Sequence, residues 1–116
     1  DVALGVPYNI AGYALLLELF ARFTGFRAGL FGHTLVDAHV YTSKPDGSMA
    51  EYDHVPGLRQ QLERRPRALP RLKIDPSIRS LEDLRPLLDA DTDTVMKHFE
   101  LSGYDPHPPI SFKVAV

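Results

Sequence analysis

The chain has 116 residues, of which 44% are hydrophobic, and it contains no cysteine. This composition predicts one small domain with a modest core. It excludes disulfides, thiolate metal sites and a cysteine nucleophile within these residues. The net charge of −2 excludes the overall basic field that draws proteins to nucleic acid or to acidic membranes. We therefore expect a small molecule or another protein chain as the partner.

The chain has neither the length of apolar sequence nor the start that a membrane or export segment needs. No apolar run reaches the roughly 18 residues of a membrane helix, because Glu18 interrupts the longest one. No basic segment precedes the first apolar stretch, so no signal peptide is predicted. We expect a cytoplasmic protein. Because the first residue is Asp1 rather than methionine, we also expect that the sequence begins inside a longer chain.

Residues 6–24 are apolar on nearly every face, which predicts a long helix buried in a core. Pro7 suits the first turn of this helix, where its missing N–H costs nothing, and Gly25 suits the position just past its end. Glu18 and Arg22 have i,i+4 spacing and are interpreted as a narrow solvated edge.

Residues 27–43 alternate between positions that carry polar and aromatic groups and positions that are mostly apolar. A period of two predicts a strand with two different faces. The turn-forming residues 44–48 then end it. The next elements are predicted to be short: a polar helix at 54–64, a strand at 69–74, a helix capped by Ser80, an acidic loop at 89–94, a strand at 98–101, and an extended tail at 110–116. Together they predict an α/β fold of the α+β type.

Charge is distributed unevenly along the second half of the chain. Basic side chains dominate residues 59–73, and acidic ones dominate residues 75–93. A nucleic-acid surface is one interpretation of the basic stretch, but the stretch lacks interleaved aromatic residues and a recognisable module. A solvated basic face that pairs with the acidic stretch is the better interpretation, so no nucleic-acid partner is predicted.

Two polar features admit more than one interpretation. His33, Asp37 and His39 share a strand face, and imidazole and carboxylate are metal ligands. Side chains along one strand stand roughly parallel and rarely converge on one ion, so we expect a polar pocket without a metal. Asn9 lies at an apolar helix start, where an unpaired amide is costly to bury. One interpretation is that its amide hydrogen-bonds the local backbone. The other is that its donor and acceptor together bind the edge of a base such as uracil.

Three segments resemble the thymidylate synthase family in order and spacing. The segment DVALGVPYNIAGYALL at 1–16 resembles the family's D-V-x-L-G-x-P-F-N-I-x-S-Y-A-L-L, and DAHVY at 37–41 resembles its D-x-H-x-Y. The third segment is GYDPHP at 103–108 together with the terminal VAV. The resemblance covers 1–116 as the carboxy-terminal portion of a thymidylate synthase domain. It implies the family's sheet packed on the long buried helix.

The resemblance implies a reductive methylation, in which dUMP becomes dTMP and 5,10-methylenetetrahydrofolate supplies both the one-carbon unit and the hydride. It implies substrate-binding residues that contact dUMP, namely Asp1, Asn9, His39 and Tyr41. It also implies folate-binding residues, namely Asp1, Gly5, Tyr8, Ala115 and Val116. Asn9 matches the residue that selects uracil, and His39 and Tyr41 match the pair on the sugar 3′-hydroxyl. A homodimer is implied as well.

The sequence departs from the family pattern in several places. Leu35 and Val36 stand where glycine is common, and Gly12 replaces a serine. Residues 44–56 and 87–95 are predicted to be insertions. The catalytic cysteine of the family is expected upstream of Asp1, so no catalytic residue is assigned here and these residues alone are expected to be inactive. A hydroxymethylase acting on dUMP and a non-catalytic nucleotide-binding homologue are the alternatives.

Overall fold

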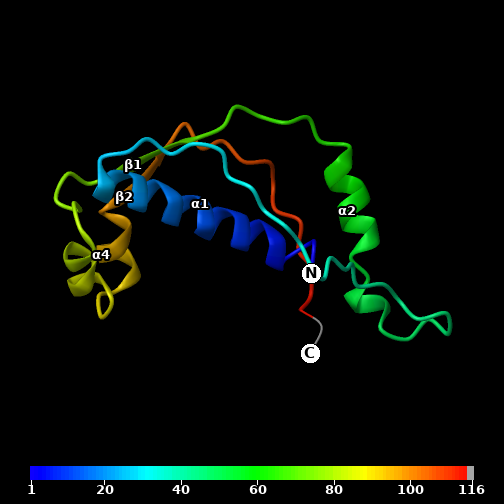
Figure 1. Cartoon of the computed structure of the whole chain (residues 1–116). Helices are drawn as coiled ribbons and strands as arrows, with labels where there is room; N and C mark the ends of the chain where they lie inside the picture. The colour runs from blue at the N-terminus through cyan, green and yellow to red at the C-terminus, as the bar shows by residue number, and fades with distance from the viewer. Residues whose placement is uncertain (115–116) are drawn as a thin grey trace. The chain divides into compact units, whose positions relative to one another are not determined.

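A computed structural model of the chain describes residues 1–114, which form two compact units. The first unit holds residues 1–17, 29–65 and 107–114. The second holds residues 18–28 and 66–106. Helices and a small antiparallel sheet are both present (Figure 1), so the expected α+β class is confirmed.

The long helix α1 runs over Gly5–Thr24, close to the predicted bounds. Pro7 lies in its first turn, and Gly25 follows its last residue with φ 73°. Glycine has no Cβ, so this left-handed conformation carries no steric cost there. The hydroxyl of Thr24 donates to the carbonyl of Phe20 over 2.7 Å and satisfies one of the last carbonyls of the helix. The predicted start and end signals are therefore confirmed.

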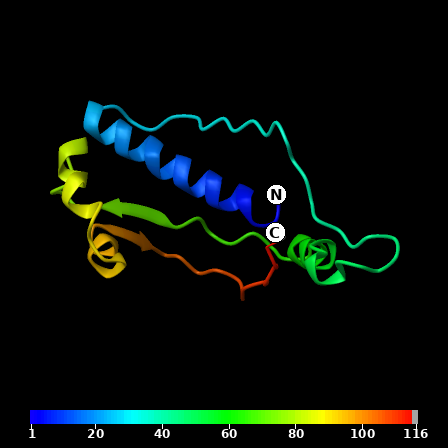
Figure 2. The same ribbon diagram turned by 90° about the horizontal axis from the view of Figure 1, so that it is seen from below.

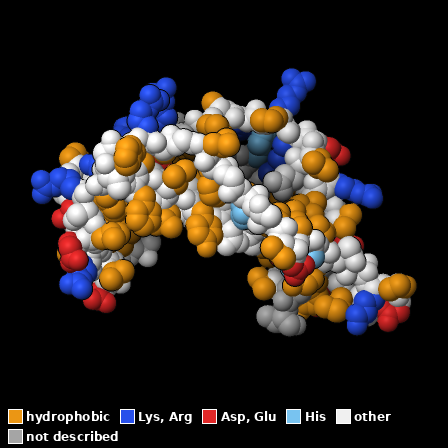
Figure 3. All heavy atoms as spheres, in the orientation of Figure 1, with side chains coloured by type: hydrophobic (Ala, Val, Ile, Leu, Met, Phe, Trp, Pro, Cys, Tyr) orange, Lys and Arg blue, Asp and Glu red, His pale blue; other side chains and the backbone are white. Residues whose placement is uncertain are grey.

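The apolar faces of α1 are only partly covered by the described residues. Leu19 and Ala21 are its buried residues, whereas the side chain of Tyr8 is 80% exposed and that of Tyr13 is 56% exposed. Hydrophobic side chains lie openly on the face seen in Figure 3. The expectation that a family sheet packs on this helix stays a prediction, because no described strand covers it in the first unit.

Residues 26–43 contain no strand among the described residues, so the strand predicted for 27–43 is wrong for this structure. Two backbone hydrogen bonds hold the segment near its end: the carbonyl of His39 accepts from Val2 over 2.9 Å, and that of Tyr41 accepts from His54 over 3.0 Å. A strand is defined by a ladder of such bonds to a neighbour, and no described segment supplies one. The alternation of residue types indicates two different faces, but it does not provide the neighbouring strand that a ladder requires.

The first unit continues with a turn and two short helices. The turn predicted at 44–48 is confirmed, because Gly47 donates to the carbonyl of Lys44 over 2.9 Å and has φ 78°. The 3-10 helix η1 follows over Ala50–Tyr52, and helix α2 follows over Val55–Leu62. Helix α2 confirms the polar helix predicted for this stretch.

The second unit is built on a two-stranded antiparallel sheet, whose arrows run in opposite directions in Figure 2. Strand β1 covers Arg71–Ile74 and pairs with β2 over Phe99–Ser102, with Leu72 opposite Leu101. Both predicted strands are thus confirmed, each shifted by a residue or two. Helix α3 at Leu81–Leu84, the 3-10 helix η2 at Arg85–Leu87, and helix α4 at Thr92–Met96 lie between them in sequence.

Two local predictions in the second unit need correction. The acidic loop predicted at 89–94 is partly helical, because Asp91 accepts a hydrogen bond from the backbone N–H of Thr94 over 2.8 Å and so begins α4. Aspartate is among the preferred N-cap residues, so an acidic side chain can begin a helix. Ser80 does occupy the N-cap of α3, but its hydroxyl donates to Asp83 over 3.0 Å instead of accepting from the backbone.

Arg22 does not form the solvated i,i+4 edge with Glu18 that its spacing predicted. Its Nε donates to the carbonyl of Ile78 over 2.6 Å, and its terminal nitrogen donates to the carbonyl of Asp75 over 3.1 Å. Ile78 is 2% exposed, so the guanidinium satisfies a carbonyl that water does not reach easily. Among residues 1–114, no helix is long and apolar enough to cross a membrane.

Candidate functional site

Asp1 organises the entry into helix α1. Its Oδ1 accepts hydrogen bonds from the backbone N–H groups of Ala3 at 2.8 Å and Leu4 at 3.4 Å, and its carbonyl accepts from Val6 at 3.0 Å. These are donors that the start of a helix would otherwise leave unpaired. The side chain of Asp1 is 16% exposed, so it is held in one place and still reached by solvent.

Gly5 and Asn9 lie one turn apart on the face of α1 that is next to Asp1. A Cβ added to Gly5 would stand 3.8 Å from Oδ1 of Asn9 and 4.0 Å from the Cβ of Asp1. The helical repeat brings Gly5 and Asn9 together. Asp1 precedes the helix and is held beside its first turn by the hydrogen bond from Val6 to the Asp1 carbonyl. Asn9 is exposed, and its amide makes no hydrogen bond to any described residue. The local-backbone interpretation of Asn9 therefore has no hydrogen bond behind it among residues 1–114, and its role in holding the pyrimidine stays a prediction.

His39 and Tyr41 form the second part of the site. Their rings meet edge to face, with centroids 5.3 Å apart and planes at 83°, which is a favourable geometry for two aromatic rings. Nδ1 of His39 lies 3.2 Å from Oδ1 of Asp37, so the carboxylate orients the imidazole. The backbone bond from Val2 to His39 places this pair beside the start of α1.

His54 continues the same row of rings, and no sequence motif singles it out. It is 1% exposed, and its ring centroid lies 5.5 Å from that of Tyr41 and 5.0 Å from that of Phe112. Its Nδ1 stands 3.6 Å from Oδ1 of Asp1. No pattern in the sequence separates His54 from the other four histidines, because burial and the approach of Asp1 arise only from folding.

The final segment of the chain packs on helix α2. A Cβ at Gly57 would stand 2.5 Å from the ring of Phe112 and 3.0 Å from the side chain of Ile110. The absence of a side chain at Gly57 is therefore what lets the segment approach. Lys113 forms an ion pair with Glu51, which raises the pKa of the Lys113 ammonium above its ordinary value through the side-chain hydrogen bond first and the opposite charge second.

The structure does not bring all of the predicted site residues together. The side chain of Tyr8 is 80% exposed and no described residue hydrogen-bonds its hydroxyl, so its place on the folate side stays a prediction. Ala115 and Val116 lie outside the described residues. Among residues 1–114 no three acidic or histidine side chains form a group that could hold a metal ion, and His33 instead meets Phe31 at 5.9 Å between ring centroids.

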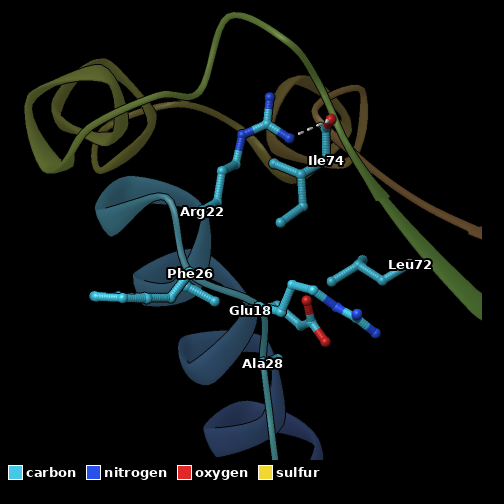
Figure 4. Close-up of a pocket in the computed structure, with 8 residues that line it drawn as sticks. Glu18, Arg22, Phe26, Ala28, Leu72 and Ile74 are labelled. Atoms are coloured by element: carbon cyan, nitrogen blue, oxygen red, sulfur yellow. Dashed lines mark hydrogen bonds between the residues drawn. The ribbon is translucent and has the colours of Figure 1, made fainter.

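The second unit has an open cavity of about 410 Å³ at the end of α1. Figure 4 shows Glu18, Phe26, Leu72 and Ile74 around it, with Arg22 turned toward the Ile74 carbonyl at 3.4 Å. The side chain of Arg22 donates to three backbone carbonyls of its own unit. This cavity has none of the residues assigned to nucleotide or folate, so the candidate site is the one in the first unit.

The fold and the arrangement around α1 define a mixed α and β protein with an exposed amide, a histidine–tyrosine pair and an ordered aspartate in one unit. Comparison with known families shows that residues 1–116 match the thymidylate synthase family. The chain belongs to the thymidylate synthase family, whose members are methyltransferases of dTMP biosynthesis. The resemblance in the three segments is therefore confirmed.

Proposed function

We propose that the protein containing these residues is a thymidylate synthase, which converts dUMP to dTMP with 5,10-methylenetetrahydrofolate. The observation that carries the proposal is the grouping of Asp1, Asn9, His39 and Tyr41 in one unit, made by the bond from Val2 to His39 and by the helical turn from Gly5 to Asn9. Membership of the family supports the same reaction class.

Each group then has a role that its chemistry allows. The amide of Asn9 accepts from N3–H of uracil and donates to O4, a match that needs both of its functions at once. His39, oriented by Asp37, and the hydroxyl of Tyr41 bind the sugar 3′-hydroxyl. Asp1 contacts the pterin, with Gly5 and Tyr8 on the same side, and its Oδ1 stays fixed by Ala3 while it does so.

The tail closes the site in this proposal. Ala115 and the carboxylate of Val116 cover the bound ligands, which excludes water and strengthens every electrostatic interaction inside. The folate supplies the one-carbon unit and the hydride when it is bound. The chain has no cysteine, so the thiolate that attacks the pyrimidine is supplied by residues outside these 116. We also propose that the protein acts as a homodimer, which sedimentation of the purified full-length protein measures.

The test uses the full-length protein, dUMP and methylenetetrahydrofolate labelled on the transferred carbon. We expect labelled dTMP together with dihydrofolate in equal amounts. Labelled hydroxymethyl-dUMP without dihydrofolate would instead identify a hydroxymethylase, and binding of dUMP without product would identify a non-catalytic homologue. The 116-residue chain alone is the matched control, and it should form no product because it lacks the thiolate.

A further inference from the structure

The aromatic rings of the first unit form a row whose exposure falls along its length. The ring centroids of Tyr41 lie 5.3 Å from those of His39 and 5.5 Å from those of His54. Phe112 follows, 5.0 Å from His54. The side chain of His39 is 40% exposed, whereas His54 is 1% exposed. Because close packing restricts a buried ring, His54 is the firmer of the two supports of Tyr41.

His54 holds Tyr41 through the main chain as well as through the ring. Its backbone N–H donates to the carbonyl of Tyr41 over 3.0 Å, and its ring plane stands at 78° to that of Tyr41. An edge-to-face contact of this kind has a preferred direction as well as a preferred distance. Residues 26–43 contain no strand among the described residues, so no ladder fixes Tyr41. The place of its ring therefore depends on its neighbours, and His54 makes two of the contacts.

The imidazole of His54 is itself fixed. Its Nε2 lies 2.8 Å from the backbone carbonyl of Lys113. A carbonyl can only accept, so Nε2 carries the hydrogen and donates, and Nδ1 of the neutral ring is an acceptor. The carboxylate of Asp1, 3.6 Å from Nδ1, also only accepts, so the two form no hydrogen bond. The ring cannot turn without losing the Lys113 bond, and it therefore presents the same surface to Tyr41.

We propose that His54 is a positioning residue for the nucleotide: fixed by Lys113, it holds the Tyr41 ring so that the hydroxyl meets the 3′-hydroxyl of dUMP. The inference rests on the proposed function, in which Tyr41 binds the sugar. His54 acts through Tyr41 and does not touch the nucleotide, because its side chain is 1% exposed. His54 falls within residues 44–56, which the sequence predicts to be an insertion, so this stretch supports the nucleotide site.

The 3′-hydroxyl of the nucleotide gives a direct test, because an effect that passes through Tyr41 must disappear when that group is absent. The full-length protein is titrated with dUMP and with 2′,3′-dideoxyuridine monophosphate, which lacks the 3′-hydroxyl, and calorimetry gives both Kd values. We expect the wild type to bind dUMP about 10-fold more tightly, the effect of one or two hydrogen bonds. A variant that only damages the fold should weaken both ligands alike.

Two substitutions at His54 separate the ring contact from the Lys113 bond. His54→Gln keeps an amide nitrogen that can donate to the Lys113 carbonyl, but it has no ring to contact Tyr41. We expect it to raise the Kd for dUMP by about 5-fold and to leave the Kd for the dideoxy analogue within about 2-fold. The loss should not exceed that of Tyr41→Phe, because it acts through the Tyr41 hydroxyl. His54→Phe returns a ring of similar size and should recover most of the affinity.

A double substitution tests whether His54 acts through Tyr41. In Tyr41→Phe the hydroxyl is already absent, so adding His54→Gln should change the Kd for dUMP by less than about 2-fold, whereas independent sites would multiply their effects. His98→Gln is the matched control: this histidine also has an Nδ1 without a partner among the described residues, but it belongs to the second unit. We expect His98→Gln to leave both Kd values unchanged.

Asp53→Ala is an independent variant that leaves the ring of His54 intact. Oδ2 of Asp53 accepts from the hydroxyl of Ser43 over 3.4 Å, and Oδ1 accepts from the N–H of Val55 over 2.9 Å. These bonds hold the segment that follows Tyr41 against the start of α2. Their loss should reduce the preference for dUMP over the dideoxy analogue by about 2- to 3-fold. This variant decides the question if His54→Gln does not fold.

The outcomes separate this proposal from the proposed function. Binding of dUMP without formation of dTMP would refute the proposed reaction and leave this test valid. A wild type that binds dUMP and the dideoxy analogue equally would contradict the sugar site, and the role of His54 would fall with it. If the wild type prefers dUMP and His54→Gln keeps that preference undiminished, the role of His54 alone is overturned. It is also overturned if the effects of His54→Gln and Tyr41→Phe multiply.

Discussion

Val2 donates its backbone N–H to the carbonyl of His39 across 2.9 Å. This one bond joins the segment that begins helix α1 to the segment that carries the histidine–tyrosine pair. Two backbone groups held at that distance leave the flanking side chains little freedom to separate, because backbone geometry fixes where each Cβ points. The pyrimidine side and the sugar side of the proposed site are therefore set by the main chain, and the side chains complete it.

Tyr41→Phe should weaken dUMP binding in the full-length enzyme. The edge contacts of Tyr41 with His39 and His54 hold the ring in place without the hydroxyl, so the substitution removes one hydrogen bond and little else. We expect the KM for dUMP to rise by about 5- to 10-fold. Steady-state kinetics at saturating folate measures it. An unchanged KM for dUMP would show that the hydroxyl of Tyr41 does not bind the sugar.

Asn9→Asp should change the preferred base. A carboxylate can accept from the amino group of cytosine, but it cannot donate to O4 of uracil. A site that lacks the donor for O4 rejects uracil strongly, so kcat/KM for dUMP should fall by about 100-fold or more. Turnover of dCMP should appear or increase. Asn9→Ala is the control, because it should lose dUMP turnover without gaining dCMP. A gain with both variants would contradict the assignment.

Arg22→Ala should destabilise the second unit. The substitution leaves the carbonyl of Ile78 without its donor in a place where the residue is 2% exposed. We expect a loss of about 1–2 kcal/mol in the free energy of unfolding, measured by urea denaturation of the full-length protein. Arg22→Lys should recover only part of it, since an ammonium cannot reach several carbonyls as the guanidinium fork does. Arg59→Ala, at an exposed position of α2, should change stability by less than about 0.5 kcal/mol.

Asp91 should make α4 sensitive to acid. Hydrogen bonds from the backbone and side chain of Thr94 hold the pKa of the Asp91 carboxyl below its ordinary value. Because the pKa of Asp91 is lower in the folded state than in the unfolded state, its carboxylate stabilises the folded protein at pH values above the unfolded-state pKa. This stabilisation is lost as the pH falls through the folded-state pKa. The exchange protection of α4 amides should therefore drop on acidification below about pH 3.8. Asp91→Asn should flatten this dependence, because an amide still caps the helix without titrating. If the exchange protection of α4 depended on pH equally in the wild type and in Asp91→Asn, Asp91 would not be the group responsible.

Local structure with its own sequence signal was predictable. The bounds of α1 follow from Pro7, Gly25 and an uninterrupted apolar stretch, and the turn at 44–48 follows from its proline and glycine. The strands β1 and β2 were also found within a residue or two. In each case the deciding interactions lie within a few residues, so the sequence of that stretch contains the information.

Site residues with a family motif were predictable in identity but not in arrangement. The sequence determined that Asp1, Asn9, His39 and Tyr41 are present and that the chain belongs to the thymidylate synthase family. It predicted a strand at 27–43 that the structure does not contain, because a strand depends on a neighbour that alternation cannot specify. It interpreted Arg22 as a solvated residue, although the carbonyls that it satisfies come from a distant stretch.

By itself, then, the sequence determined the family, the helix α1 and the chemical groups that the proposed reaction would use. Only the tertiary structure decided that His54 is buried between Asp1 and Lys113, and that Gly57 must lack a side chain for Phe112 to pack there. The physical reason is the separation in sequence between the residues that interact. Helical periodicity and turn chemistry act between near neighbours, whereas burial and the pairing of a ring nitrogen depend on residues that meet only after the chain has folded.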